Sequence, residues 1–523
     1  TEHFLTDIHG EYEAFQHVLK NASGAVKRKV NEIFGNTLRE AEKKEICTLI
    51  YYPEEKLQLV KAREKDLDDW YLITLNQLVK VCQNVSSKYT RSKVRKKMPK
   101  EFSGVIDELL YVDNTDDNKT EYYSELINTL IDVRVADSFI VVICSLIRSL
   151  TIDNLHILGD IFDRGPRPDI ILEELMHFHD VDIQWGNHDI SWMGAATGNR
   201  ACICNVLRMA LGYNGFDVLE DGYGINLRPL SMFAERVYRD DPCTCFLPQI
   251  LDKNIYDAVD PKLAAKMHKA IAVLQYKEEG QIIKRHPEYG MEERILLSAI
   301  RYDRGTVTID GKEYPMRDMN FPTVDPADPL RLTDEEEELL HTLELSFRHN
   351  ARLHEHVRFL YSNGSMYKCC NSNLLYHGCI PMTENREFDG LMVGGKMYRG
   401  KELMDFIDTQ VKNAYFLPED APEKEACRDF MWYLWNGAKS PVFGKDKNRS
   451  FEHYFIEDPE VMRETMNPYY QLSEEEETCD MILKEFGLPT KGSHIINGHM
   501  PVKIKSGETP IRAGGKLFII DGG

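Results

Sequence analysis

The chain has 523 residues, of which 42% are hydrophobic and 28% are charged, so it can bury a sizeable core and is not globally disordered. Its 85 acidic and 64 basic residues give a net charge of −21, which disfavours nucleic acid and anionic membranes as partners. The length leaves room for about three domains.

The twelve cysteines include no Cys-x-x-Cys pair, the spacing typical of structural zinc sites, so we expect reduced, mostly buried thiols in a cytoplasmic protein. The longest apolar run, 139–147, is too short to cross a bilayer, and no signal peptide is visible. Because Thr1 stands at the edge of a predicted strand, and the chain stops just after another, we expect missing residues at both ends.

Five short apolar strands, each followed by a polar cluster and separated by long helical stretches, predict an α/β fold. In chain order the clusters are Asp7-Ile-His9-Gly10, Gly159-Asp160-Ile-Phe-Asp163-Arg164-Gly165, Gly186-Asn187-His188-Asp189, His377-Gly378 and Gly498-His499. Sites in α/β sheets lie at the carboxyl ends of strands, so we expect these clusters to meet. Their glycines are expected to allow tight turns that direct the ligands inward.

The first long gap between clusters has apolar residues at three- to four-residue spacing, which predicts helices over 41–59, 67–86 and 120–150. A basic run at 91–100 lies within this gap. We interpret it as a solvated helix face, although a docking site for an anionic effector or a second substrate phosphate stays open.

The later gaps contain acidic helix starts. Thr333 with Glu336 predicts a capping box, and Ser473 with Glu476 predicts another, in a helix that Gly487 ends. Both features are interpreted as structural.

The ligand chemistry of the five clusters is that of a dinuclear metal centre. Asp7 and His9 lie on one side of an extended segment and can hold one ion, and the two oxygens of Asp160 can bridge two ions. The remaining candidates offer an amide oxygen and two imidazole nitrogens: Asn187, His377 and His499. Nitrogen and oxygen ligands without thiolate favour Mn, Fe, Zn or Co, and two such ions roughly 3.5–4 Å apart would promote displacement at phosphorus.

Taken singly, most of these clusters have a structural interpretation. An isolated Asp-x-His is more often a surface or core pair, and His377 or His499 alone would be a buried structural histidine. The Gly-Asp-x-x-Asp-Arg-Gly cluster is more specific, because two acids and an arginine between glycines rarely serve packing. The order of all five favours the metal-site interpretation.

In this order the five clusters resemble the motifs of the calcineurin-like metallophosphoesterases, with Asp189 where protein Ser/Thr phosphatases usually have glutamate. More closely, the chain resembles the class III fructose-1,6-bisphosphatases of bacteria, in the stretches 6–15, 219–226, 374–381 and 435–445. The resemblance implies a calcineurin-like β-sandwich core flanked by helices, with large helical insertions. The implied core is discontinuous, 1–20, 150–225, 365–385 and 490–523, with a helical insertion at 21–149, a mixed one at 226–364 and a mostly helical one at 386–489.

The resemblance also implies roles for the site residues. One divalent ion, expected to be Mn²⁺, is held by Asp7 and His9, and a second by Asn187, His377 and His499, with Asp160 as the bridge. A hydroxide shared by the two ions would attack the 1-phosphate with no phosphoenzyme. His188 would be the general acid, oriented by Asp163, and Arg164 would bind phosphate oxygens. A second basic group is expected among Lys445, Lys447 and Arg449, although the interpretation of these residues as a solvated basic run is favoured over it.

The implied activity is hydrolysis of fructose 1,6-bisphosphate to fructose 6-phosphate in gluconeogenesis, in the bacterial cytoplasm. Small-molecule effectors and a homo-oligomer are expected, and neither nucleic acid nor a membrane is an expected partner. A protein Ser/Thr phosphatase or a dinucleoside polyphosphate hydrolase with the same dinuclear site is the alternative. A regulatory scaffold without activity would be favoured by loss of a ligand or of His188, and neither is lost.

Overall fold

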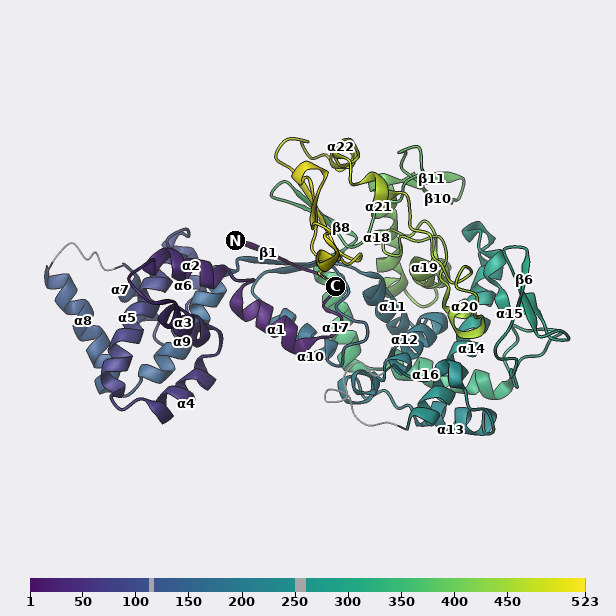
Figure 1. The fold of residues 1–523 in the computed structure, drawn as a ribbon, viewed down its shortest axis with the longest axis horizontal. Coiled ribbons are helices and arrows are strands. Elements are labelled where there is room, and N and C mark those ends of the chain that lie inside the picture. The colour runs from purple at the N-terminus through teal and green to yellow at the C-terminus, as the bar shows by residue number, and fades with distance from the viewer. Residues whose placement is uncertain (112–116, 250–259, 523) are drawn as a thin grey trace. The chain divides into compact units, whose positions relative to one another are not determined.

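The computed structural model of the chain describes residues 1–111, 117–249 and 260–522 (Figure 1). Residues 112–116 and 250–259 of the predicted insertions, and Gly523 of the predicted core, lie outside this description. The chain divides into two compact units. The first comprises Thr1–His3 and Glu13–Leu155, and the second comprises Phe4–Tyr12 and His156–Gly523.

The first unit is built mainly from helices. In chain order these are α1 (Tyr12–Asn21, of which Tyr12 belongs to the second unit), α2 (Ala25–Phe34), α3 (Glu40–Tyr51), α4 (Pro53–Arg63), α5 (Leu67–Ser86), α6 (Arg91–Lys97), α7 (Ser103–Tyr111), α8 (Asp117–Asp132) and α9 (Ala136–Thr151). Helix α5 has the predicted bounds, and it buries Leu75, Leu78, Val79 and Cys82 at helical spacing.

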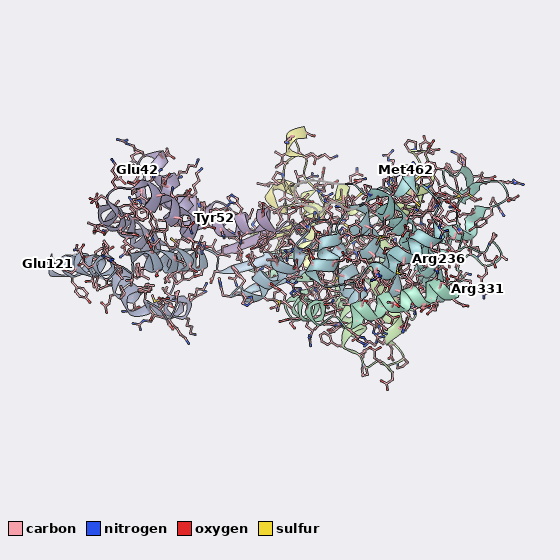
Figure 2. The ribbon with its side chains drawn as sticks, turned by 90° about the horizontal axis from the view of Figure 1, so that it is seen from below. Glu42, Tyr52, Glu121, Arg236, Arg331 and Met462 are labelled. Carbon is pink, nitrogen blue, oxygen red and sulfur yellow. The ribbon has the colours of Figure 1, made fainter. Side chains whose placement is uncertain are left out.

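Two helices predicted as continuous in this unit are broken. The prediction over 41–59 is wrong at Tyr52, labelled in Figure 2, which ends α3, because Pro53 starts the new helix α4. The prediction over 120–150 is wrong at Arg134, whose φ of 60° is incompatible with a continuous right-handed helix.

The basic run at 91–100 forms α6 and is paired within its own unit. Arg91 and Arg95 bind the Asp107 carboxylate at 2.5 and 2.6 Å, and Lys93 and Lys97 bind that of Asp153 at 2.7 and 3.2 Å. These pairs favour the structural interpretation of the run.

Two larger sheets belong mainly to the second unit, although the first halves of β1 and β2 are assigned to the first unit. Each of the five predicted strands is present, so the α/β prediction is confirmed. One sheet has the order β1 (Glu2–Leu5), β2 (Asn154–Ile157), β3 (Val181–Gln184) and β7 (Gly364–Ser365). The other has the order β13 (Ile511–Arg512), β14 (Leu517–Ile519), β12 (His494–Asn497), β9 (Asn373–Tyr376) and β8 (Tyr367–Cys370). Leu158, Leu375 and Ile496, buried at the ends of β2, β9 and β12, form one apolar cluster that joins the sheets.

Helices and two smaller sheets complete the second unit (Figure 1). The helices are α10 (Pro168–His177), α11 (Asn187–Ala196), α12 (Arg200–Gly212), α13 (Arg228–Val237), α14 (Pro261–Arg285), α15 (Leu296–Ala299), α16 (Asp334–Arg348), α17 (Ala351–Asn363), α18 (Gly400–Phe416), α19 (Lys424–Asn436), α20 (Ser450–Phe455), α21 (Tyr469–Leu472) and α22 (Glu476–Glu485). The small sheets are β4 (Ile300–Arg301), β5 (Thr306–Ile309) and β6 (Lys312–Pro315), and β10 (Gly390–Val393) with β11 (Lys396–Arg399). Short turns of helix lie at η1 (Val218–Gly222), η2 (Thr244–Phe246), η3 (Pro287–Tyr289), η4 (Glu292–Arg294), η5 (Ile504–Ser506) and η6 (Ala513–Gly515).

The predicted helix starts have different outcomes. The capping box of Thr333 and Glu336 is present at the start of α16, with hydrogen bonds of 3.2 and 2.8 Å, so that prediction is confirmed. The box at Ser473 is wrong, because the Ser473 N–H closes the last turn of α21 by donating to the Tyr469 carbonyl at 2.8 Å. Gly487, with φ of 75°, follows α22 as predicted.

The twelve cysteines all have free thiols, and most are buried, as predicted. Within the described residues, no helix combines the length and the apolar character that crossing a bilayer requires.

A buried ion pair links α14 to the start of α16. Lys277 Nζ lies 2.7 Å from Glu336 Oε2, both side chains are almost fully buried, and Nζ also donates to the carbonyls of Thr323 and Arg331 at 2.7 and 3.0 Å. The neighbouring pair of Arg236, labelled in Figure 2, and Glu335 is exposed and also 2.7 Å long.

Lys277→Met leaves the Glu336 carboxylate buried without its cation, so we expect a loss of about 3–5 kcal/mol of stability and a lower Tm in calorimetry. Adding Glu336→Gln should restore most of the loss, because the buried charge is then gone. Arg236→Met is the matched control and should cost at most about 1 kcal/mol. Equal Tm losses for the two single variants would contradict the structural role of the buried pair.

Candidate metal centre

The five polar clusters meet at the carboxyl ends of their strands in the second unit. Within these clusters, two groups of side chains have ligand atoms within 4.8 Å of one another, and Asp160 belongs to both. One group joins Asp7, His9 and Asp160, and the other joins Asp160, His377 and His499. Asn187 lies with the second group, because its Oδ1 is 3.3 Å from His377 Nε2.

Two histidines of the second group turn lone pairs toward each other. His377 Nδ1 lies 2.6 Å from the Leu158 carbonyl oxygen, and His499 Nε2 lies 3.1 Å from the Phe443 carbonyl oxygen. A carbonyl only accepts, so each of these nitrogens carries the proton and donates it. The other nitrogens, His377 Nε2 and His499 Nδ1, are left as acceptors 3.1 Å apart.

The other atoms at this point are also acceptors. Asp160 Oδ2 lies 3.3 Å from His377 Nε2, and Asn187 Oδ1 lies at the same distance from it. Two imidazole lone pairs, a carboxylate and an amide oxygen therefore converge with no donor between them in neutral histidine. Such a set repels itself unless a cation lies among its members, so these residues fit a divalent metal ion.

The first group continues this arrangement on the other side of Asp160. His9 Nε2 lies 3.5 Å from Asp7 Oδ1 and 3.9 Å from Asp160 Oδ2. The other oxygen of each carboxylate is already occupied: Asp7 Oδ2 accepts from the Thr6 hydroxyl and the His499 N–H, and Asp160 Oδ1 accepts from the His188 N–H. Asp160 Oδ2 is therefore the atom shared by both groups.

The carboxylates dominate the electrostatics of the site. Burial alone would lower the pKa of His9, but Asp160 and Asp7 overcome it and raise that pKa to about 11. Burial would also lower the pKa of His377, but the charge and contact of Asp160 outweigh burial and raise that pKa to about 9. The pKa of His499 is lowered to about 4 by burial and by His377. Without metal the carboxylates thus draw protons onto two histidines, and metal ions would displace these protons.

Backbone strain is concentrated on the ligands. Asp7, His9, Asp160 and His499 have φ of 51°, 53°, 54° and 66°, the left-handed region that costs a residue other than glycine about 1–2 kcal/mol. Gly10 and Gly159 also have positive φ, of 75° and 86°, so glycines and ligands share these turns. Gly186 serves another purpose, because a β-carbon there would lie 2.1 Å from Asp160 Oδ1.

Asp189 is a buried residue to which sequence reasoning assigned no role. Its carboxylate accepts from the N–H groups of Asp160 at 2.8 Å, Ile161 at 2.9 Å and Gly186 at 3.0 Å. Burial, followed by the nearby Asp160, raises its pKa to about 6. Asp189 thereby holds the two loops that carry Asp160 and Asn187, and an acid at the third helical position was the available signal.

The predicted catalytic residues lie beside the predicted metal ligands. His188 Nδ1 is 3.3 Å from Asp163 Oδ1, and the ring centroids of His188 and His9 are 6.1 Å apart. Arg164 Nε lies 3.8 Å from Asp163 Oδ2, and its side chain is 44% exposed and 6.0 Å from the Tyr213 ring centroid. The structure therefore brings His188, Asp163 and Arg164 together.

The three basic candidates for phosphate binding have different surroundings. Lys447 is 2.5 Å from Asp310, and Arg449 is paired with Asp310 and Glu452 at 3.5 and 3.2 Å. Lys445 lies 2.6 Å from Glu464, and its charge adds to burial and His377 in lowering the pKa of His499. Lys445 is thus within electrostatic reach of the centre.

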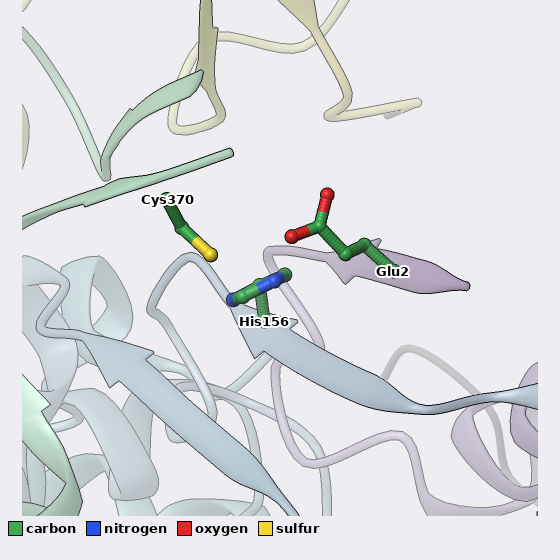
Figure 3. A group of neighbouring side chains, drawn as sticks. All are labelled: Glu2, His156 and Cys370. Atoms are coloured by element: carbon green, nitrogen blue, oxygen red, sulfur yellow. The ribbon is translucent and has the colours of Figure 1, made fainter. Parts of the chain in front are cut away.

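A further histidine, His156, belongs to a different polar group. Its Nδ1 lies 2.8 Å from Asp182 Oδ2, which also binds Lys368 Nζ at 2.6 Å. A ring nitrogen of His156 also lies within 4.8 Å of the Cys370 sulfur (Figure 3). Because Lys368 is on β8 and Asp182 is on β3, this group links the two sheets, and we interpret it as structural.

Comparison with known proteins identifies the family. A family model described as Firmicute fructose-1,6-bisphosphatase matches residues 1–523. A protein named fructose-1,6-bisphosphatase class 3 from Bacteroides thetaiotaomicron is 59% identical over 525 residues, which cover 100% of this chain and 79% of the relative. Proteins of the same name from Phocaeicola vulgatus and Clostridium novyi are 55% and 53% identical over 100% of this chain, and 79% and 78% of their own lengths.

No solved structure matches the chain. The match of the family model over the whole chain, with relatives above half identity, confirms the resemblance to class III enzymes. The chain belongs to the Firmicute fructose-1,6-bisphosphatase family, whose members are phosphoric monoester hydrolases.

Proposed function

We propose that this chain hydrolyses the 1-phosphate of fructose 1,6-bisphosphate, releasing fructose 6-phosphate and phosphate, at a dinuclear metal centre. The observation that carries metal dependence is the convergence of Asp160 Oδ2, Asn187 Oδ1 and the imidazole nitrogens of His377 and His499, which have no donor among them unless a proton or a metal ion is bound there. The sugar substrate is supported by the names of the relatives.

The proposed ligands divide into two sets that share one carboxylate. Asp160 Oδ2, which lies 3.3 Å from His377 Nε2 and 3.9 Å from His9 Nε2, would bridge. The ligands of one ion would be Asp7 and His9, and those of the other Asn187, His377 and His499. Nitrogen and oxygen ligands without thiolate suit Mn²⁺, which we propose as the metal. When bound, two such ions would activate a water molecule as the nucleophile and offset the charge at phosphorus.

His188 is the proposed general acid for the departing sugar oxygen. His188 Nδ1 lies 3.3 Å from Asp163 Oδ1, so the carboxylate would favour a proton on Nδ1 and leave Nε2 as the atom that exchanges a proton with the substrate.

Arg164 and Lys445 are the proposed phosphate-binding cations. Arg164 is half-exposed beside Asp163, so its guanidinium can turn toward a bound phosphate and donate two parallel hydrogen bonds. Lys445 adds positive charge near His499. The ion pairs of Lys447 and Arg449 with Asp310 and Glu452 make these two weaker candidates.

We also propose that the metal site is carried by a calcineurin-like β-sandwich with the domain division expected above. The two sheets that pack through Leu158, Leu375 and Ile496, and the separate helical unit, support it. The place in gluconeogenesis, the cytoplasmic location, the metabolite effectors and the homo-oligomer stay predictions.

A substrate panel tests the proposed function. With added Mn²⁺, fructose 1,6-bisphosphate should have a higher kcat/KM than phosphopeptides or dinucleoside polyphosphates, and phosphate should be released only from the 1-position. The alternative activities use the same type of dinuclear site and are not favoured by the relatives' names. A preference for phosphopeptide or dinucleoside polyphosphate would replace the proposed function.

His188→Ala should lower kcat by roughly 10²–10⁴-fold, because the leaving oxygen then departs without a proton. The bound metal, measured by elemental analysis, should stay unchanged, since no predicted ligand is removed. The matched control is His341→Ala on the exposed face of α16, which should keep the full rate. A His188→Ala protein with wild-type kcat would remove the acid assignment.

Asp160→Asn should weaken the binding of both metal ions, because the carboxylate is the proposed shared ligand. Elemental analysis after equilibration with limiting Mn²⁺ should find less of both ions, and the rise in Tm on adding Mn²⁺ to chelator-treated protein should shrink. Asp405→Asn, a change at an exposed carboxylate on α18, is the control. If Asp160→Asn still binds two ions per chain with unchanged affinity, Asp160 does not bridge.

A further inference from the structure

Trp435 touches the proposed general acid but has no role in the account above. It is the last residue but one of α19 and is 7% exposed. Its ring stands edge-on to the His188 imidazole, with centroids 4.9 Å apart and an interplanar angle of 80°. His188 is the second residue of α11, so the contact joins the end of one helix to the start of another.

The two helices hold this contact in place. Helix α19 packs on α11 so closely that a β-carbon on Gly194 would lie 3.4 Å from Met431 Cβ. The end of α19 is closed by the Gly437 N–H, which donates to the Tyr433 carbonyl at 2.6 Å, and by the Ser440 hydroxyl, which donates to the Leu434 carbonyl at 2.6 Å. The position of the Trp435 ring is therefore set by the fold.

Packing, and not hydrogen bonding, orients this indole. Among the described residues, no acceptor meets the buried Trp435 Nε1–H. In contrast, Trp432, one turn earlier on the same helix, donates its indole N–H to Glu279 Oε1 at 3.1 Å. An aromatic ring of similar thickness should therefore replace Trp435 in its contact with His188.

The imidazole of His188 needs such a contact. Its Nδ1 lies 3.3 Å from Asp163 Oδ1, but that oxygen accepts no hydrogen bond from the described residues, so this contact does not fix the tilt of the ring. The His9 ring, 6.1 Å away, bounds another side of the imidazole. The Trp435 ring contacts the imidazole directly and limits its rotation. Proton transfer to a leaving group depends steeply on the orientation of the acid.

We propose that Trp435 is a positioning residue that holds the His188 imidazole in the orientation for proton donation. The inference rests on the proposed function of His188 and adds a residue that acts through it. The contact is an aromatic edge-to-face pair, which contributes both packing and a preferred angle.

A double-mutant cycle on the metal-loaded full chain tests this role with fructose 1,6-bisphosphate. Trp435→Leu should lower kcat by ~10-fold with little change in KM, and Trp435→Phe should stay within ~3-fold of wild type. In a His188→Ala background, adding Trp435→Leu should lower kcat by less than a further ~2-fold, because the side chain that Trp435 positions is absent. Metal content should be unchanged in all these variants.

Trp432→Leu is the matched control, because it removes a buried tryptophan from the same helix without touching His188. The factor by which Trp432→Leu lowers kcat should be the same in the wild-type chain and in His188→Ala. The proposal is overturned if the Trp435→Leu loss persists in full in His188→Ala, if Trp435→Phe is as impaired as Trp435→Leu, or if Trp435→Leu keeps the wild-type rate. A wild-type chain that does not hydrolyse the sugar bisphosphate would instead remove the proposed function itself.

Discussion

The structure of the second unit depends on one unfavourable arrangement, the convergence of lone pairs on Asp160 Oδ2. The facing nitrogens of His377 and His499 are 3.1 Å apart, and both Asp160 Oδ2 and Asn187 Oδ1 lie 3.3 Å from the first of them. In neutral histidines none of these atoms can donate to another. The fold must therefore hold the set together until positive charge fills it, and this need explains much of the surrounding geometry.

Three features of the chain set up and hold this arrangement. Carbonyls of Leu158 and Phe443 fix the tautomers of His377 and His499, so the lone pairs point inward. Asp189 ties the Asp160 loop to the start of α11 with four hydrogen bonds from backbone N–H groups. Several ligands occupy left-handed backbone conformations, a strain that the packed sheets sustain. Under the proposed function, the net charge of −21 bears on solubility, whereas metal loading would decide whether a bisphosphate can bind.

The order of the clusters predicted the five strands and the meeting of their ends. The strands lie in two sheets, and the packing of these sheets through Leu158, Leu375 and Ile496 brings the two sets of carboxyl ends together. What the sequence could not predict depends on residues far apart in the chain. Lys447 is neutralised by Asp310, 137 positions away, and His188 is contacted by Trp435. The break at Arg134 has no proline or glycine to signal it. The sequence places Asp189 in its motif, but its role could not be predicted, because that role depends on hydrogen bonds to the distant loop that carries Asp160.

The central claim is that Asp160 carries two ions at once. Crystals of the Mn²⁺-loaded protein, measured by anomalous X-ray diffraction, test it most directly. We expect two anomalous peaks about 3.5–4 Å apart, both within bonding distance of Asp160, one near Asp7 and His9 and the other near His377 and His499. A single peak, or two peaks of which one does not touch Asp160, would contradict the account.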